Sequence, residues 1–151
     1  MRLFRSNSKG FTLIELLVVI VIIAALATML TANFVGVRQR GRDAQRKSDL
    51  RQIQSALELF RADNGNYPPS FPTCGQSFPT SGSTIYIKKI PCDPSTNSGY
   101  VFAASPSGCD NVSTQCIAYT IYSCLENASD SSKDGTSQST CPTASITLTN
   151  P

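Results

Sequence analysis

The chain has 151 residues, of which 40% are hydrophobic and 15% are charged, and its formal net charge is +3. A chain of this length builds one small domain beside any membrane segment that it contains. Because the sequence has no histidine, it excludes Ser/His and Cys/His catalytic arrangements, and it has neither a CxxC pair for zinc nor a glycine-rich phosphate loop. We therefore expect no enzyme activity and no cofactor.

The N-terminal part combines a basic start with a long apolar run. Residues 1–10 carry only basic charges, and from Phe11 to Val37 the only charged side chain is Glu15. About 20 apolar residues are enough to span a bilayer, but a carboxylate at the centre of such a segment costs about 2.5 to 3.5 kcal/mol. Glu15 is therefore unfavourable in a membrane segment unless another group pairs with its carboxylate.

The residues alone leave three interpretations of this run open. A secretory signal peptide would use the basic start (Arg2, Arg5 and Lys9) and a cut near AALAT, 24–28, but the run is long for that purpose and Glu15 is misplaced. A simple membrane anchor explains the length but not the carboxylate. A cut between Gly10 and Phe11 would create an α-amino group that could neutralise the Glu15 of a neighbouring copy, so that Glu15 would fix the register of assembly.

The stretch KGFTLIELLVVIVIIAAL, which starts at Lys9, closely resembles the N-terminus of type IV prepilins and of the pseudopilins of type II secretion systems. The shared features are the short basic leader, the Gly-Phe cut site, Thr12 and the glutamate that follows. The resemblance implies that a prepilin peptidase removes residues 1–10 on the cytoplasmic face and that Phe11 is N-methylated. It also implies that Glu15 pairs with the Phe11 amine of a neighbour in a helical filament.

Residues 38–63 are charged but carry a narrow apolar stripe with helical spacing. The members of the stripe are Ala44, Leu50, Ile53, Leu57 and Phe60. We expect residues 11–64 to form one helix, about 80 Å long at ~1.5 Å per residue. In the resembled family, the C-terminal half of this helix packs on a sheet.

Two glycines, Gly36 and Gly41, interrupt the expected helix where its apolar half gives way to its charged half. Each lowers helix stability by about 1 kcal/mol relative to alanine. In filaments of the resembled family the corresponding region can lose helicity, so one interpretation is a weak point. The other is simple tolerance of glycine.

A basic cluster follows the apolar run. It comprises Arg38, Arg40, Arg42, Arg46, Lys47 and Arg51, with Asp43 and Asp49 as the acidic residues among them. Such a cluster could bind anionic lipid headgroups or DNA, but we favour packing among the helices of a filament, because basic runs are usually solvated faces. The positive-inside rule would keep this end in the cytoplasm. The cysteines and the resemblance instead place residues 38–151 outside.

The stretch RADNGNYPP, 61–69, predicts the end of the helix, because Asn64-Gly65 favours a left-handed cap and two prolines cannot continue a helix. This stretch and KKIPCDP, 88–94, also resemble the pseudopilins. Residues 99–104 and 116–127 alternate apolar and polar side chains, with turn residues between them, and predict an antiparallel hairpin. The predicted fold class is α+β, with a long N-terminal helix packed on a small antiparallel sheet of two or three strands.

Six cysteines lie in the second half of the chain, where they indicate disulfide bonds in an oxidising space outside the cytoplasm. They are Cys74, Cys92, Cys109, Cys116, Cys124 and Cys141. A core this small needs covalent support, and each disulfide contributes about 2 to 4 kcal/mol. Of the fifteen pairings that six cysteines allow, we favour sequential neighbours. Reduced, scattered thiols are the alternative.

The tail from Asn127 to Pro151 is rich in serine and threonine. In the major pseudopilin of type II secretion, which this family includes, a loop near the C-terminus binds calcium through carboxylates and backbone oxygens. Glu126, Asp130 and Asp134 could do so here, but the Asp-Gly-x-Gly-Gly pattern of that subfamily is absent, and calcium needs about six or more oxygens in a defined loop. We therefore favour a solvated polar tail around a disulfide and assign no metal.

Four regions are expected: a leader peptide (1–10), a transmembrane or filament-core helix (11–37), an amphipathic helix (38–64) and a disulfide-stapled head with its tail (65–151). The expected function is that of a structural subunit that polymerises with copies of itself and with other pilins into a type IV pilus or a secretion pseudopilus. Its expected partners are the prepilin peptidase and methyltransferase, the inner-membrane assembly platform and the membrane. The precursor would lie in the cytoplasmic membrane with its N-terminus in the cytoplasm, and the filament would lie outside. The alternative is a monomeric, secreted, disulfide-rich binding protein with a cleaved signal peptide.

Overall fold

The computed structural model describes residues 10–80, 82 and 84–151. Its elements follow the order α1 (Leu13–Asn64), β1 (Val101–Ser105), β2 (Ala118–Leu125) and β3 (Ala144–Thr149). The chain divides into two compact units, and α1 contributes to both. They are the N-terminal segment, which ends at Val37, and the head, Arg38–Pro151. The predicted fold class, α+β with one long helix and a small antiparallel sheet, is confirmed.

In the N-terminal segment, the residues from Phe11 to Met29 are all exposed. A helix satisfies its own backbone hydrogen bonds, which makes it a suitable form for a run with so few polar side chains. Within the described part of the chain, no single helical segment has both the length and the hydropathy expected of a membrane span. The two consecutive segments of α1, Leu13–Met29 and Phe34–Asn64, meet both criteria only when they are taken together. Gly36 lies within α1, as does Gly41 of the head.

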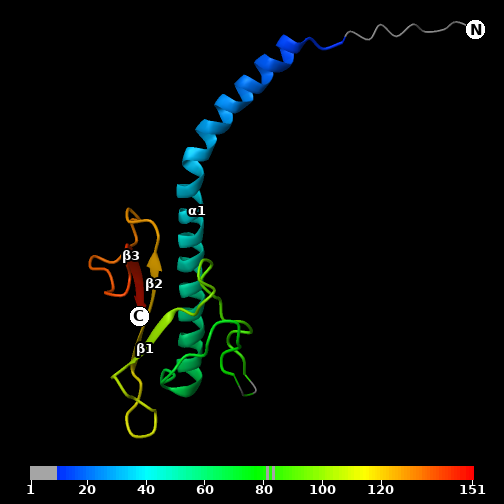
Figure 1. Ribbon diagram of the computed structural model, residues 1–151. Coiled ribbons are helices and arrows are strands. Elements are labelled where there is room, and N and C mark those ends of the chain that lie inside the picture. Colours follow the sequence, from blue (N-terminus) through cyan, green and yellow to red (C-terminus); the bar gives the residue numbers. More distant parts are fainter. Residues whose placement is uncertain (1–9, 81, 83) are drawn as a thin grey trace, which may run out of the picture. The chain divides into compact units, whose positions relative to one another are not determined.

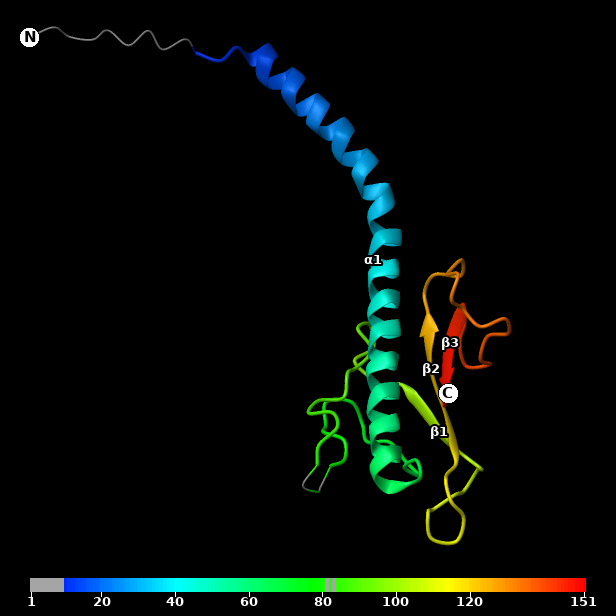
Figure 2. The ribbon, with the colours of Figure 1, turned by 180° about the vertical axis from the view of Figure 1, so that it is seen from behind.

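In the head, α1 lies between the sheet and the loop at residues 74–80 and 84–90, which Figures 1 and 2 show on opposite sides of the helix. The predicted apolar stripe faces this interior at Leu50, Ile53 and Leu57, each at most 1% exposed. Burying side chains of this size contributes roughly 1.5 to 3 kcal/mol each. The stripe is thus the helical side of a core that also includes Tyr67 and Tyr119, whose rings meet edge to face at 4.8 Å.

The sheet has the order β1-β2-β3, with both pairs antiparallel. The register places Val101 opposite Tyr122 and Thr120 opposite Thr149. Burial alternates along the central strand β2, so that every second residue from Tyr119 to Leu125 is buried. This alternation is the period-two pattern of a strand with one face on a core.

The helix ends as the sequence predicts. Gly65 has a φ of 79°, and its N–H donates to the carbonyl of Arg61 at 2.7 Å. A left-handed residue after the last helical one closes the helix end, and glycine adopts this conformation at the least cost.

Three expectations about the head need correction. Ala44 is exposed, because Asp43 and Arg46 take the buried positions at that level of the helix. The strands are shorter or shifted relative to 99–104 and 116–127. The tail is not simply solvated: it supplies β3, in which Ala144, Ser145 and Ile146 are buried.

Candidate functional site

The start of α1 carries a reciprocal cap between Thr12 and Glu15. The backbone N–H and the hydroxyl of Thr12 donate to Glu15 Oε2 at 2.9 and 2.8 Å, and the Glu15 N–H donates to Thr12 Oγ1 at 3.3 Å. This capping box satisfies N–H groups that a helix start leaves without partners, and such a cap contributes about 1 kcal/mol. The carboxylate in the apolar run thus has a partner in its own chain. The pattern Thr-x-x-Glu could have predicted it.

The expected cut site lies in exposed chain before the helix. Gly10 and Phe11 are both outside α1, and 84% of Phe11 is exposed. Exposed, non-helical backbone is where proteases act most readily. The bond between these two residues is therefore accessible in the chain as it stands.

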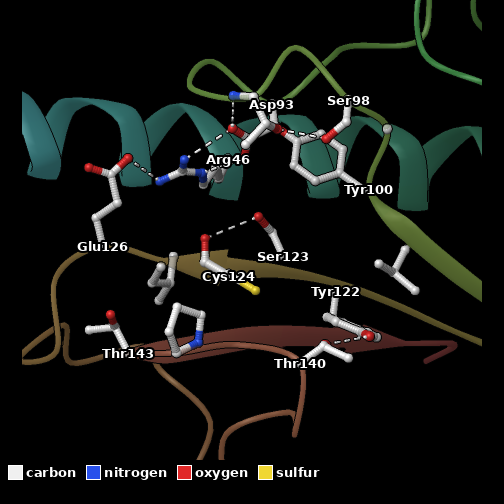
Figure 3. Close-up of a pocket in the computed structure, with 15 residues that line it drawn as sticks. Arg46, Asp93, Ser98, Tyr100, Tyr122, Ser123, Cys124, Glu126, Thr140 and Thr143 are labelled. Atoms are coloured by element: carbon white, nitrogen blue, oxygen red, sulfur yellow. Dashed lines mark hydrogen bonds and ion pairs between the residues drawn. The ribbon is translucent and has the colours of Figure 1, made fainter.

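In the head, Arg46 of α1 forms the centre of a buried ion cluster (Figure 3). Arg46 is 3% exposed, and its five N–H groups all have acceptors. Nε and Nη2 donate to Asp93 at 2.6 and 3.1 Å, and Nη2 also donates to Ser95 Oγ at 2.9 Å. Nη1 donates to Asp43 at 2.7 Å and to Glu126 at 2.9 Å. A planar guanidinium suits this use, because its donors diverge in fixed directions.

The same cluster fixes the chain where it leaves β2. The carboxylate of Asp43, which is fully buried, accepts the backbone N–H groups of Glu126 and Asn127 at 3.0 and 2.8 Å. Arg42, one turn earlier than Arg46, also pairs with Glu126, and its Nε lies 2.8 Å from Oε1. The cluster therefore joins α1, the turn at residues 93–95 and the end of β2.

Hydrogen bonding keeps the carboxylates of the cluster ionised. Hydrogen bonds from Arg42 lower the pKa of Glu126 to about 2, against an opposing effect of burial. Burial raises the pKa of Asp93, but hydrogen bonds from Arg46 and from backbone N–H groups outweigh it and lower that pKa to about 2. At neutral pH, Glu126 and Asp93 therefore bind the arginines as charged partners.

A second cation of α1 holds the segment after β2. Lys47 Nζ donates to Asp130 Oδ2 at 2.8 Å and to Ser132 Oγ at 3.2 Å, while Asp130 Oδ1 accepts the N–H and the hydroxyl of Ser132 at 2.9 and 2.6 Å. These hydrogen bonds, that from Lys47 first, lower the pKa of Asp130 to about 2.

The last of the three calcium candidates, Asp134, binds the outer edge of β3. Its Oδ1 accepts the N–H of Thr147 at 2.9 Å, and its Oδ2 accepts the hydroxyls of Thr147, at 2.7 Å, and of Ser145. Glu126, Asp130 and Asp134 therefore each have other partners. Within the described residues, no group of three or more His, Cys, Asp or Glu side chains could hold a metal ion.

The six cysteines form three disulfide bonds between sequential neighbours, the pairing that we favour from the sequence. The bonds are Cys74–Cys92, Cys109–Cys116 and Cys124–Cys141. The second bond closes the connection between β1 and β2, and the third ties β2 to the segment that precedes β3. Covalent links therefore hold the parts of the head that have little regular structure.

A groove of about 380 Å³ lies beside the cluster, between the segment 93–101, the strand β2 and the segment 140–143 that precedes β3 (Figure 3). The Tyr100 hydroxyl donates to Asp49 at 2.7 Å, and burial raises the pKa of this carboxyl. The lining includes no histidine, and its cysteine, Cys124, is disulfide-bonded. The groove therefore offers neither a Ser/His nor a Cys/His pair.

The basic cluster predicted at residues 38–51 divides into two groups. Arg42, Arg46 and Lys47 bind carboxylates of the head, so their charges stabilise the fold. Arg40 and Arg51 are exposed. Half of the predicted cluster is thus engaged by carboxylates of the head and does not present free charges to DNA or lipid headgroups.

The comparisons agree with the motif at the N-terminus and extend beyond it. Residues 5–31 match the family model of the prokaryotic N-terminal methylation motif. The chain is 33% identical over 102 residues to type II secretion system core protein G of Klebsiella michiganensis, across 60% of this chain and 70% of the relative. For the protein of the same name in Escherichia coli, the identity is 33% over 100 residues, across 58% of this chain and 67% of the relative.

A pilus protein matches as well. The type IV wide pilus major component PilA4 of Thermus thermophilus is 44% identical over 61 residues, across 40% of this chain and 47% of the relative. No solved structure matches the chain significantly. The methylation motif, the identity to core protein G over most of that relative's length and the long helix on a small sheet together lead to one conclusion: the chain belongs to the family of type IV pilins and type II secretion pseudopilins.

Proposed function

We propose that this chain is a structural filament subunit that is cut between Gly10 and Phe11, methylated at the Phe11 amine and polymerised through its N-terminal helix. The observation that carries the proposal is the match of residues 5–31 to the methylation motif, together with an apolar helical run that is exposed from Leu13 to Met29. The subunit serves a type IV pilus or a type II secretion pseudopilus. Relatives of both kinds match the chain.

The exposed apolar side chains support assembly as the state in which the N-terminal segment works. From Leu13 to Met29 the large apolar residues are between 49% and 84% exposed. Monomeric soluble proteins rarely leave such a continuous apolar surface in water. Lipid covers it before assembly, and the corresponding helices of other subunits cover it in the filament.

Glu15 sets the register of this assembly. In the chain by itself, its carboxylate accepts hydrogen bonds from Thr12. Once water is excluded, a carboxylate needs a charged partner, and the α-amino group of a neighbour's Phe11 supplies it. Only one axial offset between adjacent helices brings the two groups together, so the pair selects that offset.

The proposal also sets the location and the partners of the subunit. The precursor lies in the cytoplasmic membrane with residues 1–10 in the cytoplasm, where a prepilin peptidase cuts and methylates it. The head lies outside the cytoplasm, a location that its three disulfides support. The inner-membrane assembly platform and other pilins or pseudopilins are the remaining partners.

Mass spectrometry of the N-terminal peptide of the mature protein from its native host tests the processing. We expect a peptide that begins with methylated Phe11. A peptide that begins near Thr28 would instead identify a secreted protein with a cleaved signal peptide, and the proposal would be abandoned.

Assembly is tested separately with Glu15→Ala. We expect the variant to be cut normally and to remain in the membrane, with sheared filaments strongly reduced. Thr28→Ala is a matched control, because it changes an uncharged polar side chain of the same apolar run, whose hydroxyl donates to the Ala25 carbonyl at 2.8 Å. Normal filaments from Glu15→Ala would contradict the assigned role.

A further inference from the structure

We infer that cationic side chains of α1 hold the β2–β3 loop, residues 126–143, in place of a bound metal ion, so that the order of this loop is independent of calcium. Lys47 is the central residue, through its bonds to Asp130 and Ser132. Arg42 and Arg46 act at the start of the loop, on Glu126.

The carboxylate oxygens that a calcium ion would need already accept hydrogen bonds. Both oxygens of Glu126 are bonded to Arg42, and Oε1 also accepts from Arg46 and from the Ser95 hydroxyl. Both oxygens of Asp130 are bonded as well, one to Lys47 and the other to Ser132.

Asp134 completes the set, since its two oxygens accept from Thr147 and Ser145 of β3. A calcium ion takes about six to eight oxygens with free lone pairs. The three carboxylates are therefore committed to hydrogen-bond donors at separate places along the loop.

The cations lie where they can fix the loop over its length. Arg42, Arg46 and Lys47 lie within two turns of α1, and they contact the loop at residue 126 and again at residue 130. The Cys124–Cys141 disulfide and the bonds of Asp134 to β3 hold its remainder. A lysine on the same chain is present at a constant effective concentration, whereas a metal-held loop would vary with the calcium level.

Partial burial makes the ammonium an effective substitute for a metal ion. The side chains of Lys47 and Asp130 are 26% and 12% exposed, so salt and water screen the pair less than they screen a surface pair. Of the three ammonium hydrogens of Lys47, two have acceptors in the loop.

Limited trypsin digestion of the full chain in detergent micelles tests this inference. Lys133 is the only basic residue in 126–143, so cleavage after it reports local opening of the loop. The rate is compared in EDTA and in calcium at about 10 mM, above the dissociation constants of about 10⁻³ M of weak extracellular sites. We expect equal rates in the two solutions.

Variants isolate the contribution of Lys47. Lys47→Met should increase cleavage after Lys133 roughly fivefold, the change that about 1 kcal/mol for a paired charge produces. Lys47→Arg should keep most of the protection. Lys89→Met is the matched control, because Lys89 is exposed and no hydrogen bond or ion pair is found for it among the described residues, and it should leave the rate after Lys133 unchanged.

Two results would overturn the inference. One is protection of the unsubstituted chain by calcium, seen as slower cleavage or a higher unfolding temperature than in EDTA. The other is a Lys47→Met variant that is cleaved like the Lys89→Met control. Neither result bears on processing at Phe11 or on filament assembly, so the inference and the proposed function fail separately.

Discussion

Replacing Arg46 by methionine should destabilise the head strongly. Methionine keeps the aliphatic part of the side chain but removes the guanidinium, together with its hydrogen bonds to Asp43, Asp93, Ser95 and Glu126. Three carboxylates would then remain close together with one arginine, Arg42, and Asp43 would stay fully buried. Removing one partner from a buried ion pair costs about 3 to 5 kcal/mol, whereas an exposed pair contributes about 0 to 1 kcal/mol.

The remaining contacts place the expected loss near the lower end of this range, at about 3 kcal/mol. Asp43 keeps the backbone N–H groups of Glu126 and Asn127. Asp93 keeps those of Ser95 and Thr96, at 2.8 and 3.0 Å. Each carboxylate therefore stays partly satisfied, and only the charge that compensates them is lost.

Denaturant unfolding of the full chain in detergent, followed by tyrosine fluorescence, measures this loss. The chain has no tryptophan, and all its tyrosines lie in the head, so the signal reports the head alone. Arg40→Met is the matched control, because Arg40 is exposed on the same helix, and it should change the unfolding free energy by less than about 0.5 kcal/mol. Arg46→Lys should fall between the two, because an ammonium has fewer donors than a guanidinium.

A loss in Arg46→Met that stays below about 0.5 kcal/mol, as expected for Arg40→Met, would refute this prediction. Water would then replace the guanidinium at no net loss, and the cluster would not be what holds the turn at residues 93–95 and the end of β2 to the helix. Equal, large losses of unfolding free energy in Arg46→Met and Arg40→Met would also refute the prediction, because the loss would then come from helix stability and not from the ion cluster.

Three further predictions concern the head. Acid should destabilise the head as the pH falls from about 4.5 towards 2, because folding lowers the pKa values of Asp93, Glu126 and Asp130 to about 2. The stabilisation from these ionised carboxylates is complete above their unfolded pKa values, and it is lost as the pH falls through their folded pKa values. Unfolding free energies that stay constant down to pH 2 would contradict this. Replacing both Cys124 and Cys141 by serine should cost about 3 kcal/mol, and replacing Cys109 and Cys116 about 2 kcal/mol, because a sequence separation of 17 constrains the unfolded chain more than one of 7. Thermal unfolding that ranks the two pairs in the opposite order would contradict the argument. Gly65→Ala should cost about 1 kcal/mol through its left-handed backbone alone, because no atom lies within 4 Å of an added Cβ. Gly135→Ala, at a site that is equally open but without a positive φ, should be close to neutral in the same measurement.

The features that the sequence predicts well are those that short spacings determine. The helix end at Asn64 and Gly65, and the stripe of Leu50, Ile53 and Leu57, follow from residues within one or two turns of each other. The Thr12–Glu15 cap is equally local, and the Thr-x-x-Glu pattern is its sequence signal.

The buried ion cluster could not be predicted in the same way. Asp43 and Arg46 lie three residues apart on one helix face, but their partners Asp93 and Glu126 lie far along the chain. Helical periodicity therefore favours Ala44 as the inward residue of that turn. The structure instead buries the charged residues, because the chain brings carboxylates and N–H groups to meet them.

The third strand shows the same limit in the tail. Residues 144–149 alternate apolar and polar side chains, but serine and threonine dominate the surrounding sequence, so composition indicates a solvated segment. Ser145 is nevertheless fully buried, since its hydroxyl bonds to Asp134 and its carbonyl accepts the Asp134 N–H at 2.8 Å. A polar residue is stable inside when such partners exist, and these partners lie outside the strand.

The ion cluster also bears on the orientation of the chain in the membrane. The basic residues near the end of the apolar run conflict with the positive-inside rule if residues 38–151 lie outside. Arg42, Arg46 and Lys47 are, however, built into the fold of the head, each bonded to a carboxylate of that same unit. The rule applies to short loops of up to about 60 residues, and longer domains cross largely regardless of charge. These three side chains therefore count as parts of a translocated domain, and their presence beside the apolar run is compatible with the proposed orientation.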